Sequence, residues 1–359
     1  MGIYFLLIVA EVLLAACFKL NVKDRVKQEQ NIAMVGMFLI FLLLALKKET
    51  VGVDIIGYLD QYEAVAEMEW GANKYYHFEK GYVQLSQLFA KNGVPFQLFL
   101  ALLYAVWCHS CYLLIRDYSP NALISLLVFI CYNFLVFSIS GLRQTLAMAV
   151  CLYAFRCAVK YTKIMAILSV LLVLAATTIH ESAVVFFAVI AVVLLMNREV
   201  KITVWLAILV AVTLLRTEVW QIVSMFYGEK ITAFTLGGNF IFICGMLFLA
   251  CFSYSYYRGQ FKTLKTIGGK IFHVEAFHLR MFFLVLLCYI IFSGGTLLRA
   301  NMYFTLFFIT GIPISTSKFS MQYRFILNYA LSVFLIILFY TETLAINQLE
   351  LCPYLFFWQ

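Results

Sequence analysis

The chain has 359 residues, of which 64% are hydrophobic and only 12% charged, and its mean hydropathy is +0.95. Soluble domains carry about 25% charged residues, so this composition excludes a water-soluble fold. Because backbone groups in lipid must be paired within the chain, it predicts an all-α polytopic membrane protein. The formal net charge of +8 then has to be explained by how the basic residues are distributed across the membrane.

Apolar runs long enough to cross a bilayer recur along the whole sequence, and together they predict a single integral membrane domain over residues 1–359. A span needs about 20 apolar residues, and we predict about 12 spans, within a range of about 10 to 14. They are expected at residues 2–20, 31–46, 94–115, 122–138, 142–160, 163–178, 182–197, 203–216, 238–257, 277–293, 296–313 and 324–340. The first contains Glu11 and lacks the basic leader of a secretory signal, so we expect it to be retained.

Basic residues alternate between the segments that join these spans, and basic segments stay cytoplasmic. With the N-terminus outside, 17 of the 26 basic residues fall on the inner side. These are Lys19, Lys23, Arg25, Lys27, Arg116, Arg156, Lys160, Lys163, Arg198, Lys201, Arg258, Lys262, Lys265, Lys270, Arg280, Lys318 and Arg324. The basic stretch 258–270 is therefore predicted to be a cytoplasmic anchor, and nucleic-acid binding has no support.

Two polar segments are expected on the outer side as substrate-facing insertions. The larger is residues 47–93, between the second and third spans, and the smaller is residues 217–237. In the larger, apolar residues recur at helical spacing from Tyr82 to Phe89, which predicts a helix lying flat on the membrane surface.

Two arginines follow short runs of small residues at the predicted outer ends of spans. Arg143 follows residues 138–142, and Arg299 follows residues 294–298. A helix N-terminus with unpaired N–H groups attracts an anion, and a guanidinium matches phosphate oxygens with two parallel hydrogen bonds. Both positions are candidates for phosphate binding, and an interface anchor or a structural ion pair is the alternative at each.

His180 and Asp54 are the candidate general bases. His180 lies in a tight predicted turn between two spans, where an imidazole accepts a proton near neutral pH and Glu181 can orient it. Asp54 has Tyr58 four residues later, on the same face of any short helix. The alternative for His180 is a turn residue, and the alternative for Asp54 is a helix cap or turn residue. The sequence does not rank the two bases.

No metal site or cofactor is predicted. Cys108, His109 and Cys111 offer one pair of ligands at helical spacing, without a second pair, and they lie within a predicted span. Of the 10 cysteines, all except Cys352 fall within predicted spans, where a thiol behaves as a small hydrophobic group. These residues are therefore predicted to pack.

Several of these residues form short motifs that follow one another along the chain. The motifs are Asp54 with Tyr58 and Tyr62, Glu79-Lys80-Gly81-Tyr82, Arg143-Gln144 at the start of a span, His180-Glu181-Ser182-Ala183, and Arg299 upstream of Tyr303-Phe304. In this order they resemble the EpsG family of exopolysaccharide and O-antigen polymerases, a branch of the Wzy-type enzymes. The resemblance covers roughly residues 35 to 345, and it departs at Ile55, where an aromatic residue often follows the Asp.

The resemblance implies glycosyl transfer between undecaprenyl-pyrophosphate-linked oligosaccharides, without a metal, in a helical GT-C-like membrane fold. It places the chain in the bacterial inner membrane, with a site that faces the periplasm or exterior, and makes a polysaccharide chain-length regulator a candidate partner besides the lipid bilayer. The catalytic candidates are Asp54, His180 and Arg143. The residues expected to bind pyrophosphate and glycan are Arg143, Gln144, Arg299, Tyr303, Tyr58, Tyr62 and Glu79.

Alternative functions are a lipid-linked oligosaccharide flippase and an O-antigen ligase. A flippase has short loops and charges deep in several helices, whereas this chain has a long external segment early in the sequence. A ligase uses similar donors and outward Arg and His residues, but its large loop usually falls late. A membrane acyltransferase would use His180 and leave Arg143 and Arg299 without a purpose.

Overall fold

The computed structural model describes residues 1–72, 78–196, 199–219, 221, 238–256, 264–267, 270–292 and 296–359. Nearly all of the predicted external segment 217–237 lies outside these residues, as do residues 294 and 295 before Arg299. Helices run through most of the described chain, which confirms the all-α class. One small exception is an antiparallel pair of strands, β1 (Leu264–Ile267) and β2 (Lys270–His273), of which β1 lies within the predicted basic anchor 258–270.

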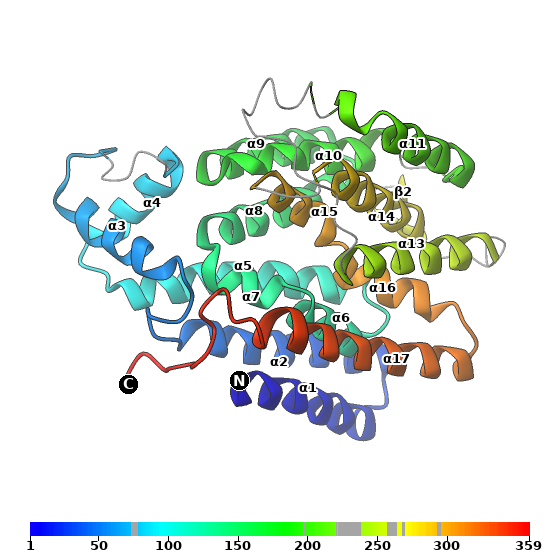
Figure 1. Ribbon diagram of the computed structural model, residues 1–359, viewed down its shortest axis with the longest axis horizontal. Coiled ribbons are helices and arrows are strands. Elements are labelled where there is room, and N and C mark those ends of the chain that lie inside the picture. Colours follow the sequence, from blue (N-terminus) through cyan, green and yellow to red (C-terminus); the bar gives the residue numbers. More distant parts are fainter. Residues whose placement is uncertain are drawn as a thin grey trace.

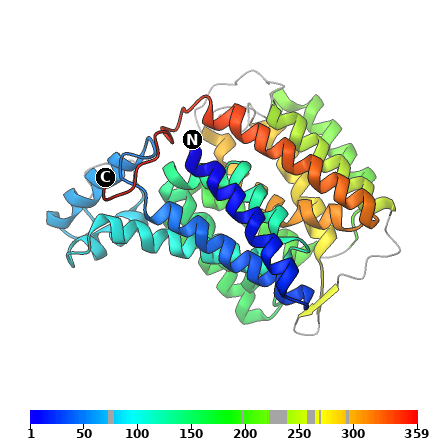
Figure 2. The same ribbon diagram turned by 90° about the horizontal axis from the view of Figure 1, so that it is seen from below.

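Most of the long helices run in one direction across Figure 1, and α3 and α4 lie at one end of this bundle (Figures 1 and 2). In chain order the helices are α1 (Gly2–Asn21), α2 (Arg25–Ala45), α3 (Ile55–Glu67), α4 (Lys80–Ala90), α5 (Phe96–Tyr118), α6 (Ala122–Cys131), α7 (Phe134–Ser140), α8 (Leu142–Ala158), α9 (Lys163–Ile179), η1 (Glu181–Val185), α10 (Phe186–Leu195), α11 (Ile202–Leu214), α13 (Gly238–Tyr256), α14 (Val274–Ile291), η3 (Thr296–Asn301), α15 (Met302–Thr305), α16 (Phe308–Ser317), α17 (Met321–Phe339) and η4 (Tyr340–Leu344).

Six helical stretches of the described chain are long and apolar enough to cross a membrane, and the bent pair α6 and α7 makes a seventh. Shorter apolar helices cover Lys163–Ile179, Glu181–Leu195 and Ile202–Leu214. The chain is therefore a multi-pass membrane protein. Each predicted span overlaps a helical segment, whereas the count of about 12 membrane crossings remains a prediction.

Two of the predicted spans are broken. The axes of α6 and α7 differ by 46°, and Asn133 between them has a φ of 61°, a left-handed conformation that Asn adopts more readily than most residues. The predicted span 296–313 divides into η3, α15 and α16, and α16 contains Pro313. Irregular backbone is tolerated within a membrane protein where it is buried or lines a cavity. Both breaks border cavities described below.

Residues 345–359, here called the C-terminal segment, fold back over the start of the predicted external segment 47–93. The N–H groups of Gly52 and Val53 donate to the carbonyl oxygens of Glu350 and Leu349, each at 3.2 Å. These bonds fix the backbone immediately before Asp54.

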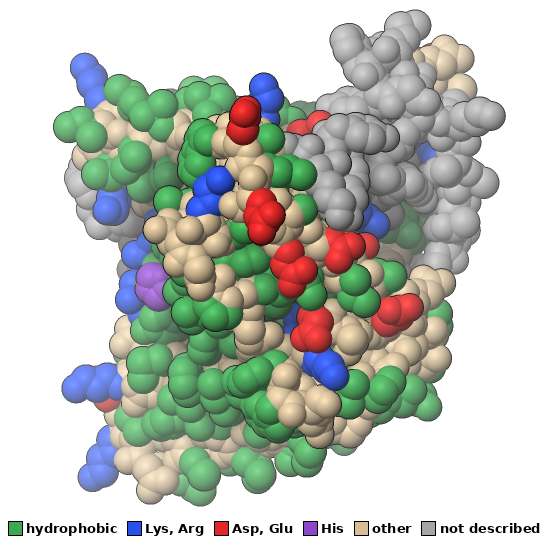
Figure 3. Space-filling model, turned by 90° about the vertical axis from the view of Figure 1, so that its left-hand side faces the viewer, with side chains coloured by type: hydrophobic (Ala, Val, Ile, Leu, Met, Phe, Trp, Pro, Cys, Tyr) green, Lys and Arg blue, Asp and Glu red, His purple; other side chains and the backbone are tan. Residues whose placement is uncertain are grey.

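The end of the bundle that carries α3 and α4 bears a group of acidic side chains among hydrophobic ones, as Figure 3 shows. The exposed acids of α3 and the turn after it are Asp60, Glu63, Glu67 and Glu69. In contrast, Tyr58, Tyr62 and Val65 of α3 are buried. Thus α3 is amphipathic, with one face packed on the protein and the other directed to solvent.

Candidate functional site

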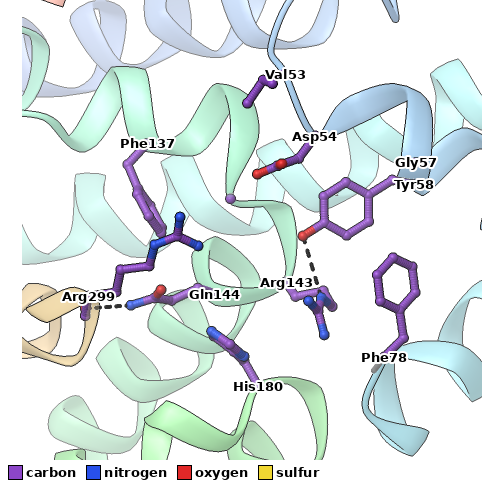
Figure 4. Close-up of a pocket in the computed structure, with 11 residues that line it drawn as sticks. Val53, Asp54, Gly57, Tyr58, Phe78, Phe137, Arg143, Gln144, His180 and Arg299 are labelled. Carbon is purple, nitrogen blue, oxygen red and sulfur yellow. Dashed lines mark hydrogen bonds between the residues drawn. The ribbon is translucent and has the colours of Figure 1, made fainter. Parts of the chain in front are cut away.

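A cavity of about 330 Å³, here called the polar cavity, opens at the end of the bundle that carries α3 and α4. Its size is typical of small-molecule sites. It is lined by Val53, Asp54, Gly57, Tyr58, Phe78, Phe137, Gly141, Arg143, Gln144, His180 and Arg299. Figure 4 shows the charged members of this set around one space. Motifs that lie far apart in the sequence therefore meet in one site.

Glu79 lies between Arg143 and His180 and bonds to both. Its Oε2 accepts a hydrogen bond from Nη1 of Arg143, and its Oε1 lies 2.7 Å from Nδ1 of His180. Oε1 also accepts from the backbone N–H of Glu181 at 3.2 Å. The side chains of Glu79, Arg143 and His180 are 17% to 22% exposed, so water screens their interactions only in part. Glu79, rather than the side chain of Glu181, thus orients the imidazole.

The pKa of Glu79 is lowered from its ordinary value of 4.5 to about 2. Burial raises this pKa, but the hydrogen bond from His180 and the positive charge of Arg143 outweigh burial. An ionised carboxylate only accepts hydrogen bonds, so Nδ1 of His180 carries the proton that it shares with Glu79. In the neutral ring the other nitrogen, Nε2, is then able to accept a proton.

Gly81 allows α4 to approach the C-terminal end of α9 closely. A Cβ atom at this position would lie 2.3 Å from Oγ1 and 2.6 Å from the carbonyl oxygen of Thr178. Glu79 directly precedes α4, and His180 directly follows α9. The close contact at Gly81 therefore sets the distance between Glu79 and His180. This explains why the Glu-x-Gly-Tyr motif has a glycine at its third position.

Arg143 lies in the first turn of α8, where Gly141 provides no side-chain cap. Its Nε donates to the hydroxyl of Tyr58 at 3.4 Å, and its guanidinium carbon lies 4.4 Å from the ring centroid of Phe78. An aromatic face attracts a cation at this separation. Phe78 was not among the predicted site residues, and its position directly before Glu79 was the available signal.

Arg299 reaches the same cavity from η3. Nε2 of Gln144 donates to the carbonyl oxygen of Arg299 at 2.8 Å, which ties η3 to α8. Within the part of the chain that the structure describes, the Arg299 guanidinium has no carboxylate partner. Arg143, by contrast, is paired with Glu79. Arg299 therefore presents to the polar cavity a guanidinium that no described carboxylate pairs with.

Asp54 faces the polar cavity from the side opposite His180 (Figure 4). It occupies the position before α3, but its side chain makes no capping hydrogen bond. Asp54 thus occupies the cap and turn position of the alternative interpretation, but its carboxylate does not cap the helix and is available to a ligand.

Three predicted binding residues do not line the polar cavity: Glu79, which pairs with Arg143 and His180, and the tyrosines Tyr62 and Tyr303. The hydroxyl of Tyr62 donates to the carbonyl oxygen of Val94 at 2.7 Å, and its ring stacks on Phe99 with centroids 4.8 Å apart. Tyr303 is fully buried, and its hydroxyl accepts from Oγ of Ser182 at 3.4 Å. Both tyrosines pack the walls of the site.

Metal ligands do not cluster in the described residues, where no group of three or more His, Cys, Asp and Glu residues could hold an ion. Cys108 and Cys111 are buried free thiols in α5. His109 lies between them in sequence, and its Nδ1 is 2.7 Å from the hydroxyl of Tyr153 on α8. The contact between His109 and Tyr153 joins α5 to α8.

Comparison with known proteins supports one family. The family model described as EpsG family matches residues 30–356, a range that includes every residue lining the polar cavity. No curated protein and no solved structure matches the chain.

Replacing Glu79 with Gln should lower the free energy of unfolding by about 1 to 3 kcal/mol at neutral pH, because Arg143 and His180 lose their shared charge. The folded pKa of about 2 lies below the ordinary value of 4.5, so the carboxylate stabilises fully above about pH 4.5 and progressively less as the pH falls toward 2. The difference in the free energy of unfolding between wild type and variant should shrink over that range. Unfolding in detergent across these pH values measures this difference, and a difference independent of pH would contradict the ion pair.

Replacing Gly81 with Ala should displace α4 and lower the free energy of unfolding by about 1 to 3 kcal/mol, because the new methyl group meets the backbone of Thr178. The matched control is Gly245→Ala in α13, where a Cβ atom meets nothing within 4 Å. Helix propensity alone makes that control neutral or stabilising by about 0.5 to 1 kcal/mol. Thermal unfolding of both variants provides the measurement, and equal stability of the two would contradict close packing at Gly81.

Proposed function

This chain belongs to the EpsG family, a family of Wzy-type polysaccharide polymerases, and we propose that it polymerises undecaprenyl-pyrophosphate-linked oligosaccharide repeats by glycosyl transfer. A hydroxyl oxygen of the acceptor repeat attacks the anomeric carbon of the growing chain and forms the new glycosidic bond. The bond from that carbon to pyrophosphate breaks, the hydroxyl proton passes to a base, and undecaprenyl pyrophosphate leaves. The charge distribution of the sequence supports the outer face of the bacterial inner membrane as the place of reaction.

The observation that carries this proposal is the meeting of Asp54, Arg143, His180 and Arg299 in one polar cavity. They come from the external segment 47–93, the start of α8, the end of α9 and η3. Glycosyl transfer from a pyrophosphate needs cations for the leaving group and a base for the incoming hydroxyl, and this cavity contains both.

Arg143 and Arg299 are assigned to the leaving pyrophosphate. Two preorganised guanidinium groups stabilise the negative charge that develops as the bond breaks, a contribution of about 3 to 4 kcal/mol for one well-placed donor. The uncapped N-terminus of α8 adds backbone N–H groups beside Arg143. Gln144 assists indirectly, because its bond to the Arg299 carbonyl holds η3 in place.

His180 is assigned as the base that accepts the proton of the acceptor hydroxyl. Glu79 fixes the proton on Nδ1, so Nε2 is unprotonated in the neutral ring and able to act, as in other carboxylate-oriented histidines. Such a base accelerates a reaction by roughly 10²- to 10⁴-fold. Asp54, on the opposite side of the cavity, is assigned to hydrogen-bond the sugar beside the reacting centre. Tyr58 and Phe78 offer aromatic surfaces to the glycan.

The Arg299→Ala variant tests the proposal with little effect on folding, because no described carboxylate loses its partner. We expect polymerisation to fall by about 10²- to 10³-fold, so that cells carry lipid-linked or surface glycans of a single repeat. Gel analysis of the glycan, together with an immunoblot for protein abundance, measures the effect. The matched control is Arg25→Ala at the exposed start of α2, which should leave long chains.

Normal chain lengths in the Arg299→Ala variant would contradict the assignment of this residue to pyrophosphate. Deletion of the whole gene separates the alternative functions. Surface glycans of one repeat indicate a polymerase, the absence of surface repeats indicates a flippase, and long chains retained on the carrier lipid indicate a ligase.

A further inference from the structure

A second cavity of about 350 Å³ adjoins the polar cavity. The two share Asp54, Phe137, Gly141 and Arg299, so they are contiguous. The remaining residues that line the second cavity are Asn133, Val136, Ser140, Met302 and Leu349. We call this second cavity the tail cleft.

Apart from the shared wall, the tail cleft is lined by three apolar side chains together with Ser140 and Asn133. Val136 and Met302 contribute hydrocarbon and thioether surface, and Leu349 adds a side chain from the C-terminal segment. Gly141 lies in the shared wall, and Asn133 lies eight positions earlier, before the start of α7. At about 1.5 Å per helical residue this separation is roughly 12 Å, so the cleft follows α7 over its full length.

The hollow continues beyond the break between α6 and α7. A third cavity, of about 110 Å³, shares Asn133 and Met302 with the tail cleft. It is also lined by Ile243 of α13 and Tyr289 of α14. The left-handed conformation of Asn133 and the 46° bend thus leave a path from the polar cavity into the helix bundle.

We propose, on the basis of the proposed function, that the tail cleft binds the first isoprene units of the pyrophosphate-linked carrier lipid. The ligand has an anionic head joined directly to an apolar chain, and the two contiguous cavities have the same order of chemistry. Arg299 lines both cavities, which places its guanidinium at the junction of pyrophosphate and prenyl chain. Burying an apolar chain against apolar side chains is favourable in proportion to the area covered.

The C-terminal segment has a defined role in this arrangement. The carbonyl of Leu349 accepts from the N–H of Val53 at 3.2 Å, so the backbone that carries the Leu349 side chain is fixed beside Asp54. Leu349 therefore lines the tail cleft from a backbone position fixed beside Asp54. Ile346, in the same segment, is 51% exposed and does not line the cleft, which makes it a matched control position.

The test compares farnesyl pyrophosphate with inorganic pyrophosphate as ligands of the purified protein in nanodiscs, with empty nanodiscs as the baseline. Wild type should bind farnesyl pyrophosphate about tenfold or more tightly than pyrophosphate, because only the former buries a chain. Leu349→Glu and Leu349→Trp place a charge or a bulky ring in the cleft. They should weaken the binding of farnesyl pyrophosphate about tenfold and change the affinity for pyrophosphate by no more than about twofold. Ile346→Glu and Ile346→Trp should change neither affinity.

If wild type bound the two ligands with equal affinity, the proposal that the tail cleft binds a prenyl chain would be wrong, while the polymerase proposal would stand. Unchanged farnesyl pyrophosphate binding in both Leu349 variants would lead to the same conclusion. Failure of wild type to bind either ligand would contradict the proposed function and the tail cleft together.

Discussion

The carboxylate of Glu79 is the group on which the arrangement of the site depends. It is supplied by residues 47–93, the segment predicted to be external, whereas its partners Arg143 and His180 come from the start of α8 and the end of α9. Ion pairs on an open surface contribute little, but these side chains are largely shielded from water, which strengthens both interactions. The same negative charge fixes the tautomer of His180, so one residue determines both the position of a cation and the state of the proposed base.

The two arginines of the site differ because of this interaction. Arg143 is balanced by Glu79 and supported by Tyr58 and Phe78, so its position is fixed before any ligand binds. Arg299 lies on a short 3-10 helix, without a carboxylate partner among the described residues, and lines both cavities. In the proposed reaction Arg143 provides preorganised charge, and Arg299 provides a guanidinium that no described carboxylate already pairs with. Departures from regular helix beside both arginines create the space for the substrate.

The sequence predicted the membrane class, the helical segments and several of the residues that line the polar cavity, because hydropathy and short motifs are local properties. Charge near the ends of spans likewise identified Asp54, Arg143, His180 and Arg299, which share one cavity in the structure. Hydropathy did not predict the break at Asn133, since a bent span has the same composition as a straight one. The pairing of Glu79 with His180 depends on the contact of Gly81 with Thr178, which joins residues far apart in sequence. Leu349 and Val53 are also far apart in sequence, so no local pattern predicted that they would lie side by side.

The most direct test of this account is a double-mutant cycle on the polymerisation rate, using purified protein and a lipid-linked repeat as substrate. The variants are Glu79→Gln, His180→Gln and their combination. Because Glu79 also holds Arg143, the double variant should be slower than His180→Gln alone, but its loss should be smaller than the product of the two single losses, since Glu79 and His180 act as one unit. A double variant whose loss equals the product of the two single losses would show that the residues act independently and would contradict the account.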